Sequence, residues 1–188
     1  MKAGLSADHI SFLGIIVAVI GAWALVEAPR QPWLFLAAAA CVQLRLLANL
    51  LDGMVAVEGG RGGPTGAIWN EFPDRIEDSL FLIAAGYAAD PLAGLIVGLL
   101  AALLAAICAY VRLLGATLGQ PQDFGGPMAK PHRMAALTGG LVAAFVARML
   151  TGNPYGSPWL MLALAIIAGG TLLTIALRLN RLSKALRG

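Results

Sequence analysis

The sequence has few charged residues and few cysteines. Asp, Glu, Lys and Arg together make up 12% of it, against about 25% in soluble domains, which argues against a soluble globular protein. Its two cysteines, Cys41 and Cys108, lie in apolar segments without metal-ligand spacing. We therefore interpret them as packing residues and not as a redox or metal site.

Apolar sequence dominates instead. Hydrophobic residues make up 59% of the chain, and the mean hydropathy is +0.80. Several apolar stretches reach about 20 residues, the length that crosses the hydrocarbon core of a bilayer. The first of them, Ile10 to Val26, has no convincing cleavage site after it and is long enough to span, which argues against a cleaved signal peptide. We expect an all-α integral membrane protein.

Turn-forming residues interrupt the apolar sequence at intervals, which predicts six transmembrane helices. The expected spans are residues 9–27, 32–57, 66–89, 91–119, 133–152 and 157–181. Because the connections are short, we expect residues 1–188 to form a single transmembrane domain, with a basic cytoplasmic tail at residues 182–188.

The positive charges predict the orientation in the membrane. Most lysines and arginines outside the spans lie near the two termini and in the loops before the third and fifth spans. The positive-inside rule places both termini and these loops in the cytoplasm, which fits a bacterial inner membrane. The net charge is +3, and its excess comes mostly from Arg178, Arg181, Lys184 and Arg187. These indicate contact with acidic lipid headgroups and no binding of nucleic acid.

Polar residues gather in the second and third spans, where a lipid environment makes them costly. Asn49, Asp52 and Ala56 share one helical face at i, i+3 and i+7. Asn70 and Asp74 share another at i and i+4. A short glycine-rich connection makes the two helices antiparallel neighbours, so their polar faces can meet near the cytoplasmic end. Such oxygen ligands suit Mg²⁺, Mn²⁺ or Ca²⁺, and an ion there would polarise a diphosphate.

The acidic residues of this polar block also have a structural interpretation. Asp52 and Asp74 could form an intramembrane ion-pair network with Arg45 and Arg75. Glu71 and Arg75, at i and i+4, are expected to pair with each other. Ion pairing and metal binding therefore both remain open for the two aspartates.

Two glycines of the block have two interpretations as well. Gly53 and Gly66 would let a flat or bulky ligand approach the backbone. Small residues are equally typical of close helix–helix packing in membranes. The glycines alone do not decide between a ligand site and a packing contact.

A basic segment precedes the fifth span. It reads Phe124-Gly-Gly-Pro-Met-Ala-Lys130-Pro-His132-Arg133, and Arg112 lies in the span before it. A glycine-rich turn that leads to Lys130 and Arg133 at a helix N-terminus favours anion binding. The same two cations are also typical of a positive-inside loop, whereas Arg112 within a span indicates a function. We interpret His132 as an interfacial residue.

The spacing of the polar block resembles the signature of the CDP-alcohol phosphotransferase family, D-x2-D-G-x2-A-R-x8-G-x3-D-x3-D. The matching residues here are Asn49, Asp52, Gly53, Ala56, Val57, Gly66, Asn70 and Asp74. Asn49 and Asn70 stand where the family has aspartate, and Val57 where it has arginine. The resemblance implies six transmembrane helices, usually a homodimer, and a cytoplasmic active site that binds divalent metal and a CDP diphosphate.

The resemblance also implies a role for each matching residue. Asp74 would be the general base that deprotonates the acceptor hydroxyl. The metal ligands, for one or two Mg²⁺ or Mn²⁺ ions, would be Asn49, Asp52, Asn70 and Asp74. The residues that shape the CDP pocket would be Gly53, Ala56 and Gly66. The residues that bind the acceptor or its phosphate would be Arg112, Lys130 and Arg133. Because the amides add no negative charge, the number of metal ions is left open.

These observations predict a phospholipid-biosynthetic transferase. It would move a phosphatidyl group from a CDP-linked donor, such as CDP-diacylglycerol, to a hydroxyl acceptor and release CMP. The two asparagines keep a second hypothesis open, a catalytically impaired family member that binds a CDP-lipid or serves as a membrane assembly partner. A small transporter is supported only by the buried charges. The acceptor alcohol is not predicted, although the basic loop favours an anionic one.

Overall fold

The computed structural model describes residues 7–58, 66–153 and 157–187, and within them the side chains of residues 12–49, 68, 71–153 and 157–187. Six helices form the regular secondary structure of this part of the chain. They are α1 (Ala7–Glu27), α2 (Trp33–Glu58), α3 (Gly66–Ala89), α4 (Ala93–Thr117), α5 (Lys130–Thr151) and α6 (Pro158–Arg187). The expected all-α fold with six helices is confirmed.

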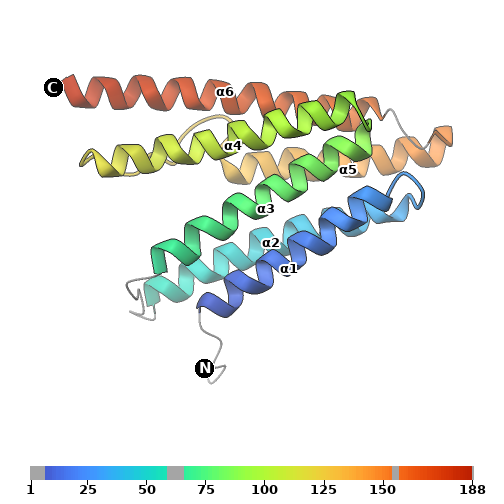
Figure 1. The fold of residues 1–188 in the computed structure, drawn as a ribbon, viewed down its shortest axis with the longest axis horizontal. Helices are drawn as coiled ribbons and strands as arrows, with labels where there is room; N and C mark the ends of the chain where they lie inside the picture. Colours follow the sequence, from blue (N-terminus) through green and yellow to red (C-terminus); the bar gives the residue numbers. More distant parts are fainter. Residues whose placement is uncertain (1–6, 59–65, 154–156, 188) are drawn as a thin grey trace.

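The helices pack as a ring around the core. α1 contacts α2 and α3, α3 contacts α4, α4 contacts α6, and α5 contacts both α6 and α2. In Figure 1, α1, α2 and α3 are tilted against α4, α5 and α6, and the two groups diverge toward one end. α2, α4 and α6 finish at that end, and α3 and α5 begin there (Figure 1). The polar residues of α2 and α3 therefore lie near the N-terminus of α5.

Most helix ends lie within two residues of the expected spans, and the start of α5 and the end of α6 differ by more. α5 begins at Lys130, before the expected residue 133, because Pro131 in the first helical turn lacks an N–H group that would have no partner there anyway. α6 continues to Arg187, beyond the expected residue 181. No glycine or proline interrupts its last turns, and Lys184 and Arg187 lie where the helix dipole favours cations. Residues 182–187 are thus a helical extension of α6.

A tight turn and a close backbone contact fix α3 against α4. Asp90 Oδ1 accepts hydrogen bonds from the backbone N–H groups of Leu92 (3.0 Å) and Ala93 (2.7 Å), which caps the start of α4. These bonds lower the pKa of Asp90. Further along the two helices, a Cβ atom added at Gly98 of α4 would lie 2.6 Å from the carbonyl oxygen of Leu82 in α3. Glycine therefore lets the two backbones touch.

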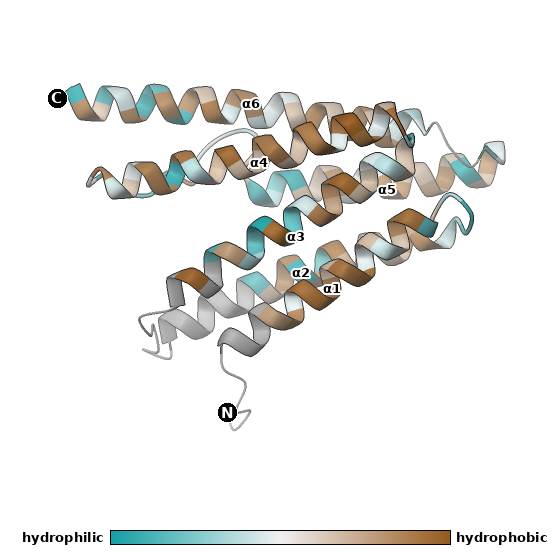
Figure 2. Ribbon diagram, viewed as in Figure 1, coloured by the Kyte–Doolittle hydropathy of each residue, from teal (hydrophilic) through white to brown (hydrophobic). Residues whose placement is uncertain are grey.

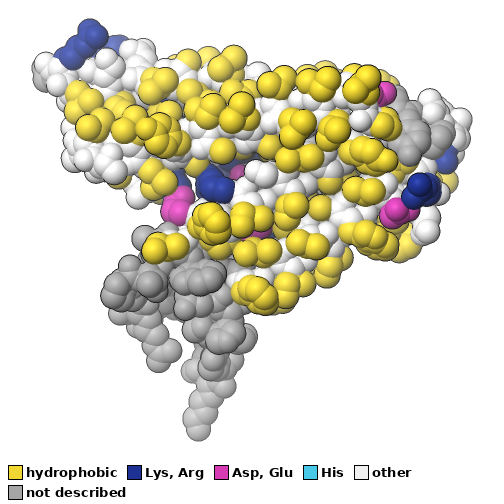
Figure 3. Space-filling model, in the orientation of Figure 1, with side chains coloured by type: hydrophobic (Ala, Val, Ile, Leu, Met, Phe, Trp, Pro, Cys, Tyr) yellow, Lys and Arg dark blue, Asp and Glu magenta, His cyan; other side chains and the backbone are white. Residues whose placement is uncertain are grey.

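The core is apolar, and so is much of the exterior. Alanine and leucine make up most of the core, with Phe35 and Phe81 as its largest apolar side chains. α4, α5 and α6 are each long and apolar enough to cross a membrane, and α1 and α2 contain the shorter apolar stretches Phe12–Glu27 and Trp33–Asn49. Hydrophobic residues run along the helices and cover much of the visible face (Figures 2 and 3). This exterior is that of a membrane protein.

Candidate active site

A cavity of about 420 Å³ lies between the helices, with walls from α2 to α6 and from the loop before α5. Its charged lining consists of the cations Arg75, Arg112, Lys130, Arg133 and Arg178 and the carboxylates Glu71 and Asp74. Charged side chains are visible among hydrophobic ones near the middle of the face in Figure 3. The surplus of positive charge suits an anionic ligand.

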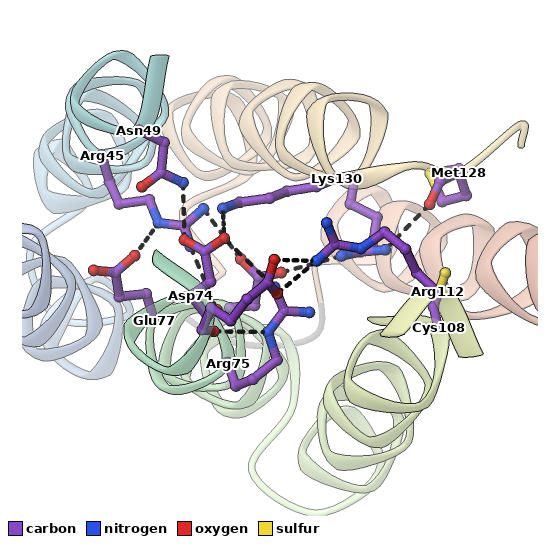
Figure 4. A network of polar contacts seen from close by, with 12 residues as sticks. Arg45, Asn49, Asp74, Arg75, Glu77, Cys108, Arg112, Met128 and Lys130 are labelled. Carbon is purple, nitrogen blue, oxygen red and sulfur yellow. Dashed lines mark hydrogen bonds and ion pairs between the residues drawn. The ribbon is translucent and has the colours of Figure 1, made fainter. Parts of the chain in front are cut away.

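Asp74 lies at the centre of the polar contacts, with donors from three helices around it (Figure 4). Its Oδ1 accepts hydrogen bonds from Arg45 Nη2 at 2.8 Å and Asn49 Nδ2 at 2.9 Å. Its Oδ2 forms an ion pair with Lys130, and Arg75 Nη2 lies 3.4 Å from the same oxygen. Each carboxylate oxygen therefore has two donors. The expected contact between the polar faces of α2 and α3 is present.

Arg45 holds the acidic face of α3 from beneath the cavity. Its side chain is fully buried, pairs with Glu77, and places Nη1 3.2 Å from Asp78 Oδ1. Gly14 of α1 makes room for this arrangement, because a Cβ atom there would overlap the Glu77 carboxylate. With Asp74 as its third acidic partner, Arg45 forms an ion-pair network inside the bundle, as the structural interpretation of the sequence expected for Arg45 and Asp74. Asp52, the other acidic residue of that interpretation, lies outside the described side chains.

Arg133 belongs to the same buried network. Its Nη2 donates to Asp78 Oδ2 at 3.1 Å, and its Nη1 donates to the carbonyl oxygen of Met128 at 3.2 Å. The side chain is only 3% exposed. Although Arg133 lines the cavity, its guanidinium group therefore bonds α5 to α3 and to the loop before α5.

Arg112 connects α4 with α3 and with the loop before α5. Its Nη2 donates to Glu71 Oε1 at 2.6 Å and Oε2 at 2.5 Å, and its Nη1 donates to Gln122 Oε1 at 2.9 Å. The guanidinium also lies over the Phe124 ring, 4.8 Å from the ring centre. The predicted pair of Glu71 and Arg75 is confirmed at 3.6 Å, but Arg112 is the closer partner of Glu71.

Arg178 corrects a prediction made from the sequence. It was predicted to contact lipid headgroups together with Arg181, Lys184 and Arg187, but it is only 6% exposed, whereas those three side chains are exposed. Its Nε donates to the carbonyl oxygen of Gly125 and its Nη1 to that of Cys108, both at 3.0 Å. Arg178 thus fastens the loop before α5 onto α6 and α4, and it completes the basic wall of the cavity. Its position a full turn inside the predicted last span was the signal available in the sequence.

The predicted site residues fall into two groups. The structure brings Asn49, Asp74, Arg112, Lys130 and Arg133 together around one cavity. The others, Asp52, Gly53, Ala56, Gly66 and Asn70, lie outside the residues whose side chains are described. Among the described side chains, no group of three or more His, Cys, Asp or Glu residues is arranged to hold a metal ion.

Two described side chains nevertheless fit a divalent ion. Asn49 and Asp74 carry oxygen atoms of the type that Mg²⁺ and Mn²⁺ prefer, on neighbouring helices and one hydrogen bond apart. As placed, the Asn49 amide directs its nitrogen to Asp74, and a rotation of the amide would present its oxygen instead. The pair could therefore contribute to a metal site without a change of the backbone.

Comparisons with known proteins identify a phosphatidylinositol phosphate synthase and an inner membrane protein as relatives. No protein-family model matches the chain. It is 26% identical over 186 residues to the phosphatidylinositol phosphate synthase of Mycolicibacterium smegmatis, an alignment that covers 96% of this chain and 78% of that protein. It is 31% identical over 146 residues to the inner membrane protein YnbA of Escherichia coli, which covers 78% of this chain and 70% of that protein.

The fold is also that of a solved relative, the phosphatidylinositol phosphate synthase PgsA1 of Mycobacterium tuberculosis. Its structure in complex with manganese and citrate matches with a TM-score of 0.73 and 26% identity, covering 95% of this chain and 83% of the other. Its structure with CDP-DAG bound matches with a TM-score of 0.73 and 25% identity, covering 95% and 87%. The sequence signature, the six-helix fold and these relatives agree: the chain belongs to the CDP-alcohol phosphotransferase family and is an enzyme of the CDP-alcohol phosphatidyltransferase type.

Proposed function

We propose that the protein transfers a phosphatidyl group from a CDP-linked lipid, such as CDP-diacylglycerol, to the hydroxyl group of a small acceptor. The observation that carries this proposal is the position of Asp74, a carboxylate in the wall of a cation-lined cavity of about 420 Å³. The CDP-DAG bound to the M. tuberculosis relative supports the choice of donor. The product is the acceptor phospholipid, and CMP leaves.

Asp74 acts as the general base in this reaction. The acceptor oxygen forms a bond to the donor phosphorus that carries the lipid alcohol, while the bond from that phosphorus to the bridging oxygen of CMP breaks. The hydroxyl proton moves to an oxygen of Asp74 and leaves through the cavity. Arg45, fully buried beneath it, keeps the Asp74 carboxylate oriented toward the cavity.

The metal site would consist of Asn49, Asp52, Asn70 and Asp74, holding one or two Mg²⁺ or Mn²⁺ ions. The manganese in the M. tuberculosis relative and the oxygen donors of Asn49 and Asp74 support it. Such an ion would neutralise negative charge on the diphosphate. Gly53, Ala56 and Gly66 would shape the pocket for the CDP group.

The acceptor would meet the basic wall of the cavity. Lys130 and Arg112 are the candidates for contact with it, and Arg133 orients α5 behind them. The five arginine and lysine side chains around the cavity favour an acceptor that carries a phosphate or another negative charge. A phosphate is also the group that an Arg or Lys recognises at a helix N-terminus such as that of α5.

The arrangement in the membrane follows from the same proposal. All six helices would cross a bacterial inner membrane, with both termini and the cavity on the cytoplasmic side. The cavity lies at the end where α2, α4 and α6 finish and α5 begins, and the cations Lys130, Lys184 and Arg187 lie in the terminal turns of α5 and α6 at that end (Figure 1). As in the family generally, two copies would associate as a homodimer.

The test is the release of CMP. Purified protein would be incubated with CDP-diacylglycerol, Mg²⁺ or Mn²⁺, and a panel of neutral and phosphorylated alcohols. We expect CMP release that needs the metal and that is fastest with a phosphorylated alcohol. If no alcohol of the panel supports the release of CMP, the proposal is wrong.

A second candidate is a protein that binds a CDP-lipid without turning it over. The hydrogen bond from Asn49 to Asp74 favours it, because a family aspartate at position 49 could not donate that bond to a carboxylate. The double variant Asn49→Asp/Asn70→Asp separates the two candidates. If it releases CMP where the natural sequence does not, the asparagines silence the site.

A further inference from the structure

Lys130 is held differently from the other cations of the cavity. Arg112 and Arg133 each bond a carboxylate and a second acceptor on another segment, and Arg178 bonds two backbone carbonyls. Among the described side chains, Lys130 pairs with Asp74 alone. The arginines are thus fixed by several directed bonds, whereas Lys130 depends on one ion pair.

The chemistry of lysine makes this pair easy to exchange. Its ammonium group is a compact charge on a flexible four-carbon stem and has no fixed fork geometry. The Lys130 side chain is 21% exposed, and both it and Asp74 line the cavity. Rotation of the stem therefore moves the charge from Asp74 toward a ligand in the cavity without displacing α5.

A divalent ion at Asp74 would have to replace one of its donors. Arg45 cannot leave, because its side chain is fully buried and it also pairs with Glu77 and Asp78. Of the two cations at Oδ2, Arg75 is also held by the carbonyl oxygen and the carboxylate of Glu71, whereas Lys130 has no second partner among the described side chains. Lys130 is therefore the less firmly held of the two, and its positive charge would repel a metal ion at the same carboxylate oxygen. Metal and ammonium therefore compete for Oδ2 of Asp74.

Asn49 sharpens that competition. An amide at this position gives the site less negative charge than an aspartate would for holding an ammonium group and a divalent ion side by side. Asn49 itself directs a donor to Asp74. Both cations would thus compete at Asp74.

We propose that the Lys130–Asp74 ion pair couples the binding of a divalent metal to the binding of a phosphate group in the cavity. A metal at Asp74 frees Lys130 to bind phosphate, and a phosphate on Lys130 frees Asp74 to bind metal. The coupling is positive, and linkage makes it reciprocal. The inference rests on the proposed function for its two ligands. It adds that the acceptor site reaches full strength only when the metal is bound.

Direct metal binding tests the coupling. The full-length protein in nanodiscs of zwitterionic lipid would be titrated with Mn²⁺, and free Mn²⁺ would be measured by electron paramagnetic resonance with and without glycerol 3-phosphate. A titration without protein corrects for the complex of Mn²⁺ and the phosphate in solution. Coupling between sites commonly changes affinity by about 5- to 150-fold, and we expect the phosphate to tighten Mn²⁺ binding about tenfold.

Three variants assign that effect to Lys130. Lys130→Met should bind Mn²⁺ more tightly than the natural protein in the absence of phosphate, and phosphate should no longer change its affinity. Lys130→Arg keeps the charge and should retain the phosphate effect. Lys184→Met removes an exposed lysine in the last turn of α6 and should behave like the natural protein. Elution as a single species in gel filtration confirms that each variant is folded.

The outcomes separate this inference from the proposed function. Unchanged or weaker Mn²⁺ binding by Lys130→Met, or a phosphate effect that persists in it, rejects the coupling; if CMP is still released, the proposed function stands. Tighter binding and a lost phosphate effect in Lys130→Met support the coupling even if no CMP is released. Absence of Mn²⁺ binding in every variant rejects both.

Discussion

The two halves of α3 are packed by opposite means. Toward its N-terminal end, Asp74, Glu77 and Asp78 meet cations from α2 and α5 through polar contacts. Toward its C-terminal end, Leu82 and Gly86 touch the backbone of α4 at glycines. Charged contacts can exchange partners while the helices stay in place, whereas a backbone contact allows no such exchange. One half is thus suited to binding ligands, and the other fixes the helix that carries them.

The largest expected effect comes from the charged half. Asp74→Asn removes the general base and leaves a side chain of the same shape, so CMP release should fall about 100-fold or more. Asp90→Asn, the same exchange at the far end of α3, should leave CMP release unchanged. Undiminished turnover in purified Asp74→Asn would show that another group accepts the proton.

The next effect tests the buried arginine beneath the site. Arg45→Met leaves Glu77 and Asp78 buried without their shared cation, and breaking a buried pair from one side typically costs about 3–5 kcal/mol. Chemical denaturation in detergent would measure the loss. Arg181→Met breaks the exposed pair with Asp123 and should cost about 1 kcal/mol or less.

A double variant sharpens that prediction. Adding Glu77→Gln to Arg45→Met removes one uncompensated charge, so the double variant should be more stable than Arg45→Met alone. If the two changes instead add their costs, Glu77 contributes to stability independently of Arg45.

The same division explains what the sequence could predict. The helices follow from apolar length and from turn residues such as Asp90 and Pro91, both of which are local properties. The meeting of Asn49 and Asp74 also follows, because helical periodicity and a short connection bring their faces together.

Contacts that depend on the packing of distant helices could not be predicted. Arg133 pairs with Asp78 across 55 positions, and Arg178 reaches Cys108 across 70. Such pairs depend on how far each helix is shifted and rotated against its neighbour, which side-chain volume and backbone approach decide. The sequence indicated that Arg45 joins a network, but it did not show that Glu77 and Asp78 are its partners.

A smaller effect is expected in the glycine half of α3. In Gly98→Ala, the added Cβ atom would lie 2.6 Å from the carbonyl oxygen of Leu82, which must move with its helix. Overpacking of this kind typically costs about 1–3 kcal/mol. Gly139→Ala in α5 is the matched control, because a Cβ atom there meets nothing within 4 Å. Equal denaturation midpoints for the two variants would show that the contact is not tight.

The smallest expected effect on stability concerns Asp90, whose carboxylate caps the N-terminus of α4 in the turn between α3 and α4. Asp90→Ala should lower the thermal midpoint slightly at pH 7, because the N–H groups of Leu92 and Ala93 lose their acceptor. Since the pKa of Asp90 is lowered in the folded protein, its contribution is complete above the unfolded value of about 3.9 and is lost as the pH falls through the folded value. Thermal scans at several pH values should therefore show that the difference in thermal midpoint between the natural protein and Asp90→Ala becomes smaller at acidic pH. A gap independent of pH would mean that the ionised carboxylate is not what caps the helix.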